Sequence, residues 1–178
     1  MAPTITELHG AGVKFRVGTT KNLFDIKFED GILEIPEIQI QDDTELTIKN
    51  LIAFEQCHCR EHYISDYTCL LDCFVNGPKD VDMLVKHRIV KHGLGDSSGV
   101  SRLINNIGEG VVVDTDNFYF ASICKDLNDY YGTDWHRWKA NLWQNYLNTP
   151  WAIISVVAAG VLLLLTLIQT ISSIVSIT

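Results

Sequence analysis

The sequence has 178 residues, with 14 basic and 22 acidic side chains and a formal net charge of −8. All of this charge lies in the first 150 residues or so, a length that can bury one hydrophobic core. The negative charge repels a nucleic-acid backbone, so nucleic acid is excluded as a general partner. The five cysteines are an odd number, and no N-terminal signal peptide pattern is visible, which predicts reduced thiols rather than a disulfide framework.

Residues 13–36 predict a small β-hairpin. Residues 13–17 alternate in period two, and the segments 23–28 and 32–35 flank Glu29-Asp30-Gly31. An Asp-Gly pair between alternating segments is typical of a hairpin, because the primed turns need positive φ. Pro36 limits how far the second strand can pair.

Residues from about 44 to 147 predict helices. Asp42-Asp43-Thr44 offer N-caps for a first helix that runs to about residue 57. The apolar spacing of the first helix predicts one face made of Leu46, Asn50, Leu51 and Phe54. Further helices are expected near 63–74, from about 78 to before Gly93, over 100–111, and from about 120 to 142, where Gly132-Thr133 is a possible interruption. The aromatic stripe of the last helix indicates core packing more than a ligand surface.

The last part of the chain predicts one transmembrane helix over residues 150–172, with a short tail at 173–178. The span from Trp151 to Ile171 has no charged residue, and more than half of its positions are Leu, Ile or Val. Each of these favours insertion into a bilayer by about 0.3–0.6 kcal/mol, and roughly 20 helical residues cross the hydrocarbon. The alternative is a buried core helix, which is usually shorter and keeps a polar edge.

The flanks of this span predict its orientation. Trp143, Tyr146 and Trp151 cluster where an interfacial aromatic belt would lie, and Arg137 and Lys139 lie on the N-terminal side. The positive-inside rule then places the preceding domain in the cytosol of a single-pass membrane protein, with the lipid bilayer as one partner. The predicted fold class is mainly α: an acidic helical domain over residues 1–149 with a small N-terminal β-hairpin, followed by one C-terminal transmembrane helix.

A cluster of cysteines and histidines at residues 57–73 raises the question of a zinc site. Thiolates and imidazoles are the ligands that zinc prefers, and four of them close a structural site. The candidate ligands are Cys59, His62, Cys69 and Cys73. Their spacing matches no known zinc finger or ribbon, and free cysteine is also a common core residue, so buried thiols are the simpler interpretation.

No catalytic constellation is apparent, so the sequence predicts no enzyme and no cofactor. It has neither a Gly-x-Ser-x-Gly elbow nor a phosphate-binding P-loop. The glycine-rich segment 92–99 opens a helix and offers free backbone N–H groups to an anion, but no strong strand is predicted before it, which favours a plain loop. The acidic residues of segments 25–34 and 42–45 lack the spacing of a calcium loop and indicate a solvated face.

Several distinctive segments follow one another along the chain: Thr6-Glu7-Leu8, Ala11-Gly12-Val13-Lys14-Phe15, Asp25-Ile26-Lys27-Phe28, Gly31-x-Leu33-Glu34-Ile35-Pro36, Asn50-Leu51-Ile52-Ala53-Phe54-Glu55-Gln56-Cys57, Asp80-Val81, Asn117-Phe118-Tyr119-Phe120 and Pro150-Trp151-Ala152-Ile153-Ile154-Ser155. Together, and in this order, they closely resemble the C-terminal half of a plant family of membrane proteins known only as domain of unknown function 247. The resemblance spans nearly the whole chain. It implies a plant origin, a helical fold ending in one transmembrane segment, and no established catalytic residues.

Three functional hypotheses follow. The first is a non-enzymatic, membrane-anchored interaction, signalling or recognition component with an unknown protein partner, which agrees with what the resemblance implies for the family. The second is a zinc-binding domain that uses the cluster at residues 57–73. The third is a truncated remnant of a longer family member, because members of this family are typically much longer than this chain.

Overall fold

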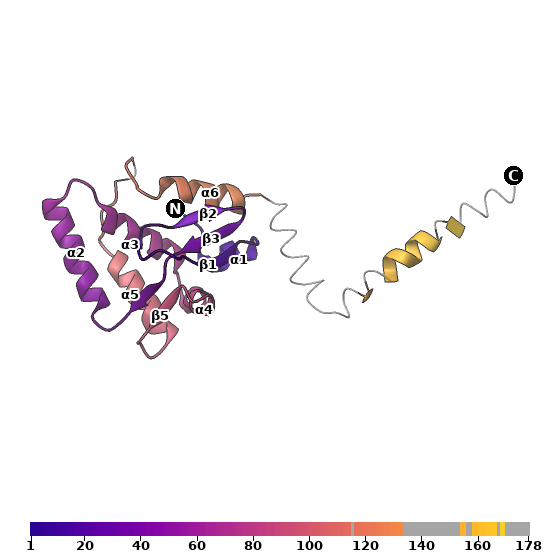
Figure 1. Cartoon of the computed structure of the whole chain (residues 1–178), viewed down its shortest axis with the longest axis horizontal. Helices are drawn as coiled ribbons and strands as arrows, with labels where there is room; N and C mark the ends of the chain where they lie inside the picture. The colour runs from indigo at the N-terminus through magenta and orange to yellow at the C-terminus, as the bar shows by residue number, and fades with distance from the viewer. Residues whose placement is uncertain (115, 134–153, 156–157, 167, 170–178) are drawn as a thin grey trace. The chain divides into compact units, whose positions relative to one another are not determined.

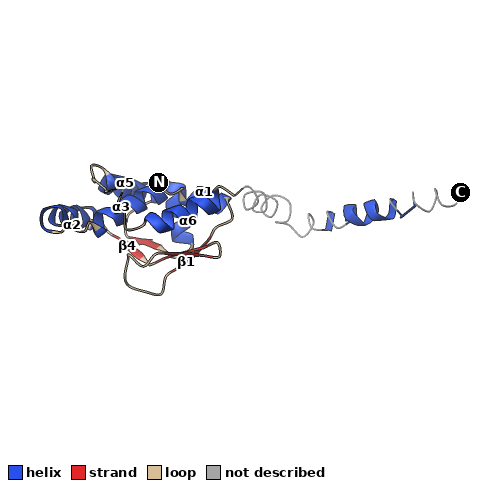
Figure 2. Cartoon of the chain, turned by 90° about the horizontal axis from the view of Figure 1, so that it is seen from above, coloured by secondary structure: helices blue, strands red, loops and turns tan. Residues whose placement is uncertain are grey.

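The computed structural model describes residues 1–114, 116–133, 154–155, 158–166 and 168–169 (Figure 1). Contacts divide the chain into two units, Met1–Arg137 and Trp138–Thr178. Within the first unit the strands gather on one side and the helices on the other (Figure 2). The unit is mainly helical with a small β region near its N-terminus, as the sequence predicted.

A three-stranded sheet follows the first helix, α1 (Ile5–Gly10). Its strands are β1 (Lys14–Val17), β2 (Lys27–Glu29) and β3 (Ile32–Ile35), in the order β1-β3-β2. The predicted hairpin is confirmed: β2 and β3 are antiparallel, and Asp30 and Gly31 both have positive φ, 51° and 74°. A side chain at position 31 would also meet the ring of Tyr130. Gly31 is therefore required for two reasons, its positive φ and the close approach of Tyr130.

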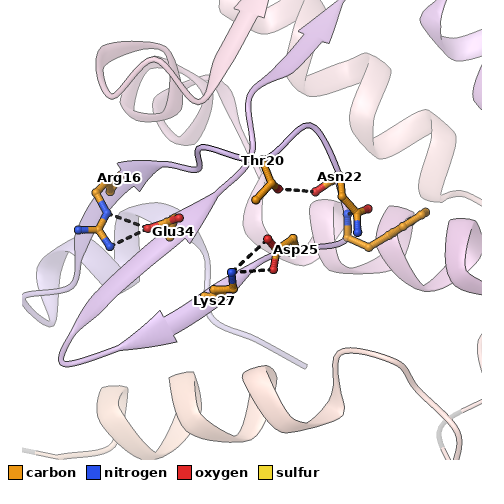
Figure 3. A network of polar contacts seen from close by, with 7 residues as sticks. Arg16, Thr20, Asn22, Asp25, Lys27 and Glu34 are labelled. Atoms are coloured by element: carbon orange, nitrogen blue, oxygen red, sulfur yellow. Dashed lines mark hydrogen bonds and ion pairs between the residues drawn. The ribbon is translucent and has the colours of Figure 1, made fainter.

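The strand β1 pairs in parallel with β3, an arrangement that the sequence did not predict. The register sets Arg16 opposite Glu34, and their side chains form an ion pair of 2.6 Å across the strands (Figure 3). Opposite charges at facing positions of a sheet stabilise this pairing modestly.

The predicted third helix is too long, because its last part is a strand of a second, two-stranded sheet. The helix α4 (Pro78–Lys86) ends well before Gly93, and the chain continues into β5 (Val90–His92). Arg88 has a φ of 61°, which turns the chain out of the helix. The strand β5 then pairs in parallel with β4 (Ile38–Ile40), and hydrogen bonds between segments more than 40 residues apart outweigh the local helical pattern.

The remaining helices lie close to the predicted positions. They are α2 (Thr44–His58), α3 (Tyr63–Phe74), α5 (Ser97–Gly108) and α6 (Ala121–Tyr131). The helix α3 has the predicted bounds, and α5 begins after Asp96, whose carboxylate accepts a hydrogen bond from the backbone N–H of Gly99. The helix α6 ends before Gly132, so the predicted long helix is interrupted there, and residues 134–147 lie outside the described residues.

Three buried carboxylates join segments that are distant in sequence. Asp80 of α4 accepts hydrogen bonds from the backbone N–H and the hydroxyl of Thr6 of α1. Glu55 of α2 accepts them from the backbone at the start of α3. Asp66 of α3 accepts one from the backbone N–H of Tyr119, and burial raises the pKa of Asp66. Each carboxylate thus satisfies backbone donors that would otherwise be buried without partners.

The predicted transmembrane helix is the part of the fold class that requires correction. In the parts of the chain that the structure describes, no helix is long and apolar enough to cross a membrane. Of the predicted span 150–172, residues 154–155, 158–166 and 168–169 are described, and the rest lies outside the described residues.

Candidate functional site

The structure does not bring the four predicted zinc ligands together. Cys59 follows the last residue of α2 and is exposed, and His62 precedes α3. Cys69 and Cys73 lie one turn apart on α3 and are half-buried. Among the described residues, no group of three or more His, Cys, Asp or Glu side chains is arranged to hold a metal ion. The geometry therefore lends no support to the zinc hypothesis.

Cys69 and Cys73 nevertheless differ in their chemistry. A hydrogen bond from the Cys69 thiol, together with one from the backbone N–H of Ala2, holds the pKa of Cys73 below the usual value of a thiol. The same hydrogen bond and burial raise the pKa of Cys69. Burial raises the pKa of the neighbouring Cys124 to about 11. Because the thiolate is the nucleophile, we expect Cys73 to be the most reactive of these three thiols.

We expect iodoacetamide to alkylate Cys73 before Cys69 and Cys124 in the folded chain. The labelling of Cys73 should slow only when the pH falls below its pKa and protonates the thiolate. Because that pKa is lowered, the labelling should remain fast down to a lower pH than the labelling of an ordinary thiol. Peptide mass spectrometry after short labelling at a series of pH values measures this order. Equal labelling of Cys73 and Cys124 at neutral pH would contradict the assignment.

Two acidic residues in and beside the N-terminal sheet, Asp25 and Glu34, are paired with basic side chains. Lys27 forms an ion pair of 2.9 Å with Asp25, and the hydrogen bond from Lys27 lowers the pKa of Asp25 (Figure 3). Glu34 is paired with Arg16 in the same sheet. These carboxylates lie on an accessible surface with their own cations, as the solvated-face interpretation predicts.

The glycine-rich segment 92–99 follows a strand, β5, that the sequence analysis did not anticipate. This strand-loop-helix order is typical of anion sites at a helix N-terminus. Here the carboxylate of Asp96 already accepts the hydrogen bond of Gly99 at 2.7 Å, and Ser97 donates to Asp82. A negative side chain of the protein thus occupies the start of α5, which disfavours a bound anion.

The most distinctive surface lies on the outer side of α2. Leu46, Leu51 and Phe54 are 67%, 45% and 59% exposed. Leu46 and Phe54 are two turns apart, and the Phe54 ring stacks on His58 at a centroid distance of 4.6 Å. We call this set of residues, Leu46, Leu51, Phe54 and His58, the outer face of α2. Figure 1 shows α2 at the edge of its unit.

The opposite side of α2 makes the contacts with the core. Ile52 is buried, Ile48 packs partly against the core, and the Glu55 carboxylate is 2.7–2.9 Å from its donors Ile64 N and Ser65 N. The face of Leu46, Asn50, Leu51 and Phe54 that the apolar spacing picked out is therefore not the face that meets the core. The sequence does contain a signal for the true face, because Ile48 and Ile52 form a second i, i+4 pair on the other side.

A comparison with protein families decides where this chain belongs. The model of the family described as "Plant protein of unknown function", DUF247, matches residues 1–165. The chain belongs to the DUF247 family. This confirms the family that the sequence motifs indicated, over nearly the whole chain. That it corresponds to the C-terminal half of longer members stays a prediction.

Two proteins of Arabidopsis thaliana are similar to this chain. UPF0481 protein At3g47200 is 27% identical over 173 residues, which cover 93% of this chain and 36% of that protein. Putative UPF0481 protein At3g02645 is 26% identical over 177 residues, which cover 98% of this chain and 33% of that protein. The chain thus spans about a third of the length of these curated relatives. No solved structure matches it.

Proposed function

We propose that this DUF247 chain is a non-enzymatic protein-interaction component that docks its partner on the outer face of α2. The observation that carries the proposal is the exposure of Leu46, Leu51 and Phe54 on one helix whose other side is already packed against the core. A surface helix normally has one apolar stripe, directed at the core. A second apolar stripe is typical of a helix that packs against another protein surface.

The partner that fits is the part of the longer DUF247 proteins that this chain does not span. The curated relatives are about three times longer than the matched region, so this region coexists with a large further portion in them. An apolar helix of that portion, laid against α2, would remove three large apolar side chains from water. Each contributes up to about 1.5–3 kcal/mol when fully buried. The contact is intramolecular in a longer protein and intermolecular when the two parts are separate chains.

The test is binding in trans. The portion of UPF0481 protein At3g47200 outside the matched region is produced separately and titrated into this chain by calorimetry. We expect saturable binding, weakened at least about tenfold by Phe54→Asp, because one lost apolar contact of this kind is worth about 1.4 kcal/mol or more. Leu46→Asp should have the same effect.

The matched control is Val112→Asp. Val112 is 78% exposed and lies outside α2, so this change adds the same charge at an exposed apolar residue without touching the outer face. It should leave binding within about twofold. Failure to bind, or equal losses in the Val112 and Phe54 variants, would refute the proposal. If the chain self-associates through Phe54 but does not bind the relative's portion, the outer face of α2 binds a second copy of the chain. That result would also refute the proposal.

A further inference from the structure

A cavity of about 390 Å³ lies beneath α2, in the first unit. Its walls come from β4, from the first turns of α2, from α3 and from α5. Among the residues that line it, the buried apolar ones are Ile38, Ile40, Leu71, Leu103, Ile104 and Ile107. Its volume falls in the range of about 300–1,000 Å³ that is usual for small-molecule sites, and a mostly apolar wall is typical of such sites.

The charge of this cavity restricts its ligand. Among the described residues that line it, none is basic, and the one carboxylate, Asp43, is exposed. The net charge of −8 adds to the repulsion of an anion. The apolar interior offers no partner to a cation, whose burial without one is costly. The ligand that fits is therefore uncharged.

The polar groups at the wall point to one further feature of the ligand. The hydroxyl of Thr68 donates to the carbonyl of Ile64 at 2.8 Å, and that of Thr44 accepts from the backbone N–H of Gln41. Tyr67 also lines the cavity, is 5% exposed, and has a buried hydroxyl without a hydrogen-bond partner in the described structure. A buried polar group of this kind is rare in proteins. Since burial raises the pKa of Tyr67, its hydroxyl keeps the proton and remains a donor.

We propose that this cavity binds an uncharged, mainly apolar small molecule with one hydrogen-bond acceptor, such as a carbonyl oxygen. A small movement of the Tyr67 side chain lets the Tyr67 hydroxyl donate a hydrogen bond to this acceptor. The site is distinct from the outer face of α2, because α2 lines the cavity with Ile48 and with Thr44 and Thr47 of its first turn, and with none of the four residues of that face. The proposal therefore stands whether or not α2 docks a protein.

The experiment uses two neutral fluorescent probes and the full chain. One is 6-propionyl-2-(dimethylamino)naphthalene, which carries a ketone, and the other is N-phenyl-1-naphthylamine, which has no carbonyl. Both should bind saturably at one site. Tyr67→Phe should weaken the ketone probe about three- to tenfold, the effect of one hydrogen bond, and change the affinity of the other probe less than about twofold.

Two variants locate the probe. Thr47→Trp places a large side chain at an exposed position on the rim, and Ile104→Phe fills the interior; circular dichroism checks that both remain folded. Either should weaken both probes at least about fivefold, by steric exclusion. Phe54→Asp, on the outer face of α2, should change neither.

Three results would overturn the proposal. They are the absence of saturable binding to the folded chain, loss of binding in Phe54→Asp rather than in Thr47→Trp, and a Tyr67→Phe effect that is equal for the two probes or absent for both. Retained probe binding with no protein partner for α2 would leave this site standing and refute only the docking function.

Discussion

Replacing Phe74 with alanine is expected to lower the free energy of unfolding by about 3–5 kcal/mol. Phe74 is the last residue of α3 and is fully buried in the core cluster, which joins α3 to α5 and to the sheets. The truncation leaves a cavity that the surrounding helices fill only in part, so lost contacts add to the lost transfer free energy. Urea denaturation followed by far-ultraviolet circular dichroism measures the change.

The control for this variant is Phe54→Ala. It makes the same truncation on α2, where the ring is 59% exposed, and should change the stability by about 0.5 kcal/mol or less. Because the whole domain is stable by only about 5–15 kcal/mol, Phe74→Leu serves as a milder variant with a smaller loss in the same direction. Comparable losses for Phe74→Ala and Phe54→Ala would show that the core is not centred on α3.

Replacing Asp80 with asparagine is expected to cost about 3 kcal/mol, the second largest effect. One carboxylate oxygen accepts from the backbone N–H and the hydroxyl of Thr6, at 2.8 and 2.6 Å. The other accepts from the backbone N–H groups of Asn76 and Gly77. An asparagine offers one acceptor in place of two, so its amide NH₂ faces donors on one side. The thermal midpoint and the urea midpoint should both fall.

The matched control is Asp82→Asn on the same helix. Asp82 is exposed and accepts a hydrogen bond from Ser97, so losing its charge should change the stability by about 1 kcal/mol or less. Thr6→Val, which removes the hydroxyl donor and keeps the backbone donor, should fall between the two Asp variants. If Asp80→Asn and Asp82→Asn are alike, the Asp80 carboxylate is not what joins α1 to α4.

Several elements were predictable because their signals act over a few residues. The turn at Asp30-Gly31 needs positive φ at both positions, and this requirement is visible in two letters of sequence. The bounds of α3 follow from apolar spacing and from the break at Asn76-Gly77-Pro78. The family was also recognisable, because its motifs are short and occur in order along the chain.

The parts that failed depend on contacts between distant residues. The predicted transmembrane helix rested on the length and apolar composition of one segment and on its flanking residues, and no described helix meets the length and apolarity that crossing a membrane requires. The strand β5 lies in a segment whose apolar residues also fit a helix, and its pairing with β4 decides against the helix. Local propensity is a weak prior that such tertiary contacts override.

The sequence by itself determined the mainly helical class, the hairpin turn, the order of the helices α2 to α6 and the family, whereas it did not predict α1. The tertiary structure decided which side of α2 meets the core. Both sides carry apolar residues, and the side with Ile52 and Glu55 is the one that packs against the core and the start of α3. It also decided that, among the described residues, no three of the predicted zinc ligands come together, and that a cavity forms beside Tyr67. The physical reason is range: turns and caps depend on neighbouring residues, whereas faces, cavities and ligand sets depend on residues that only the packed chain brings together.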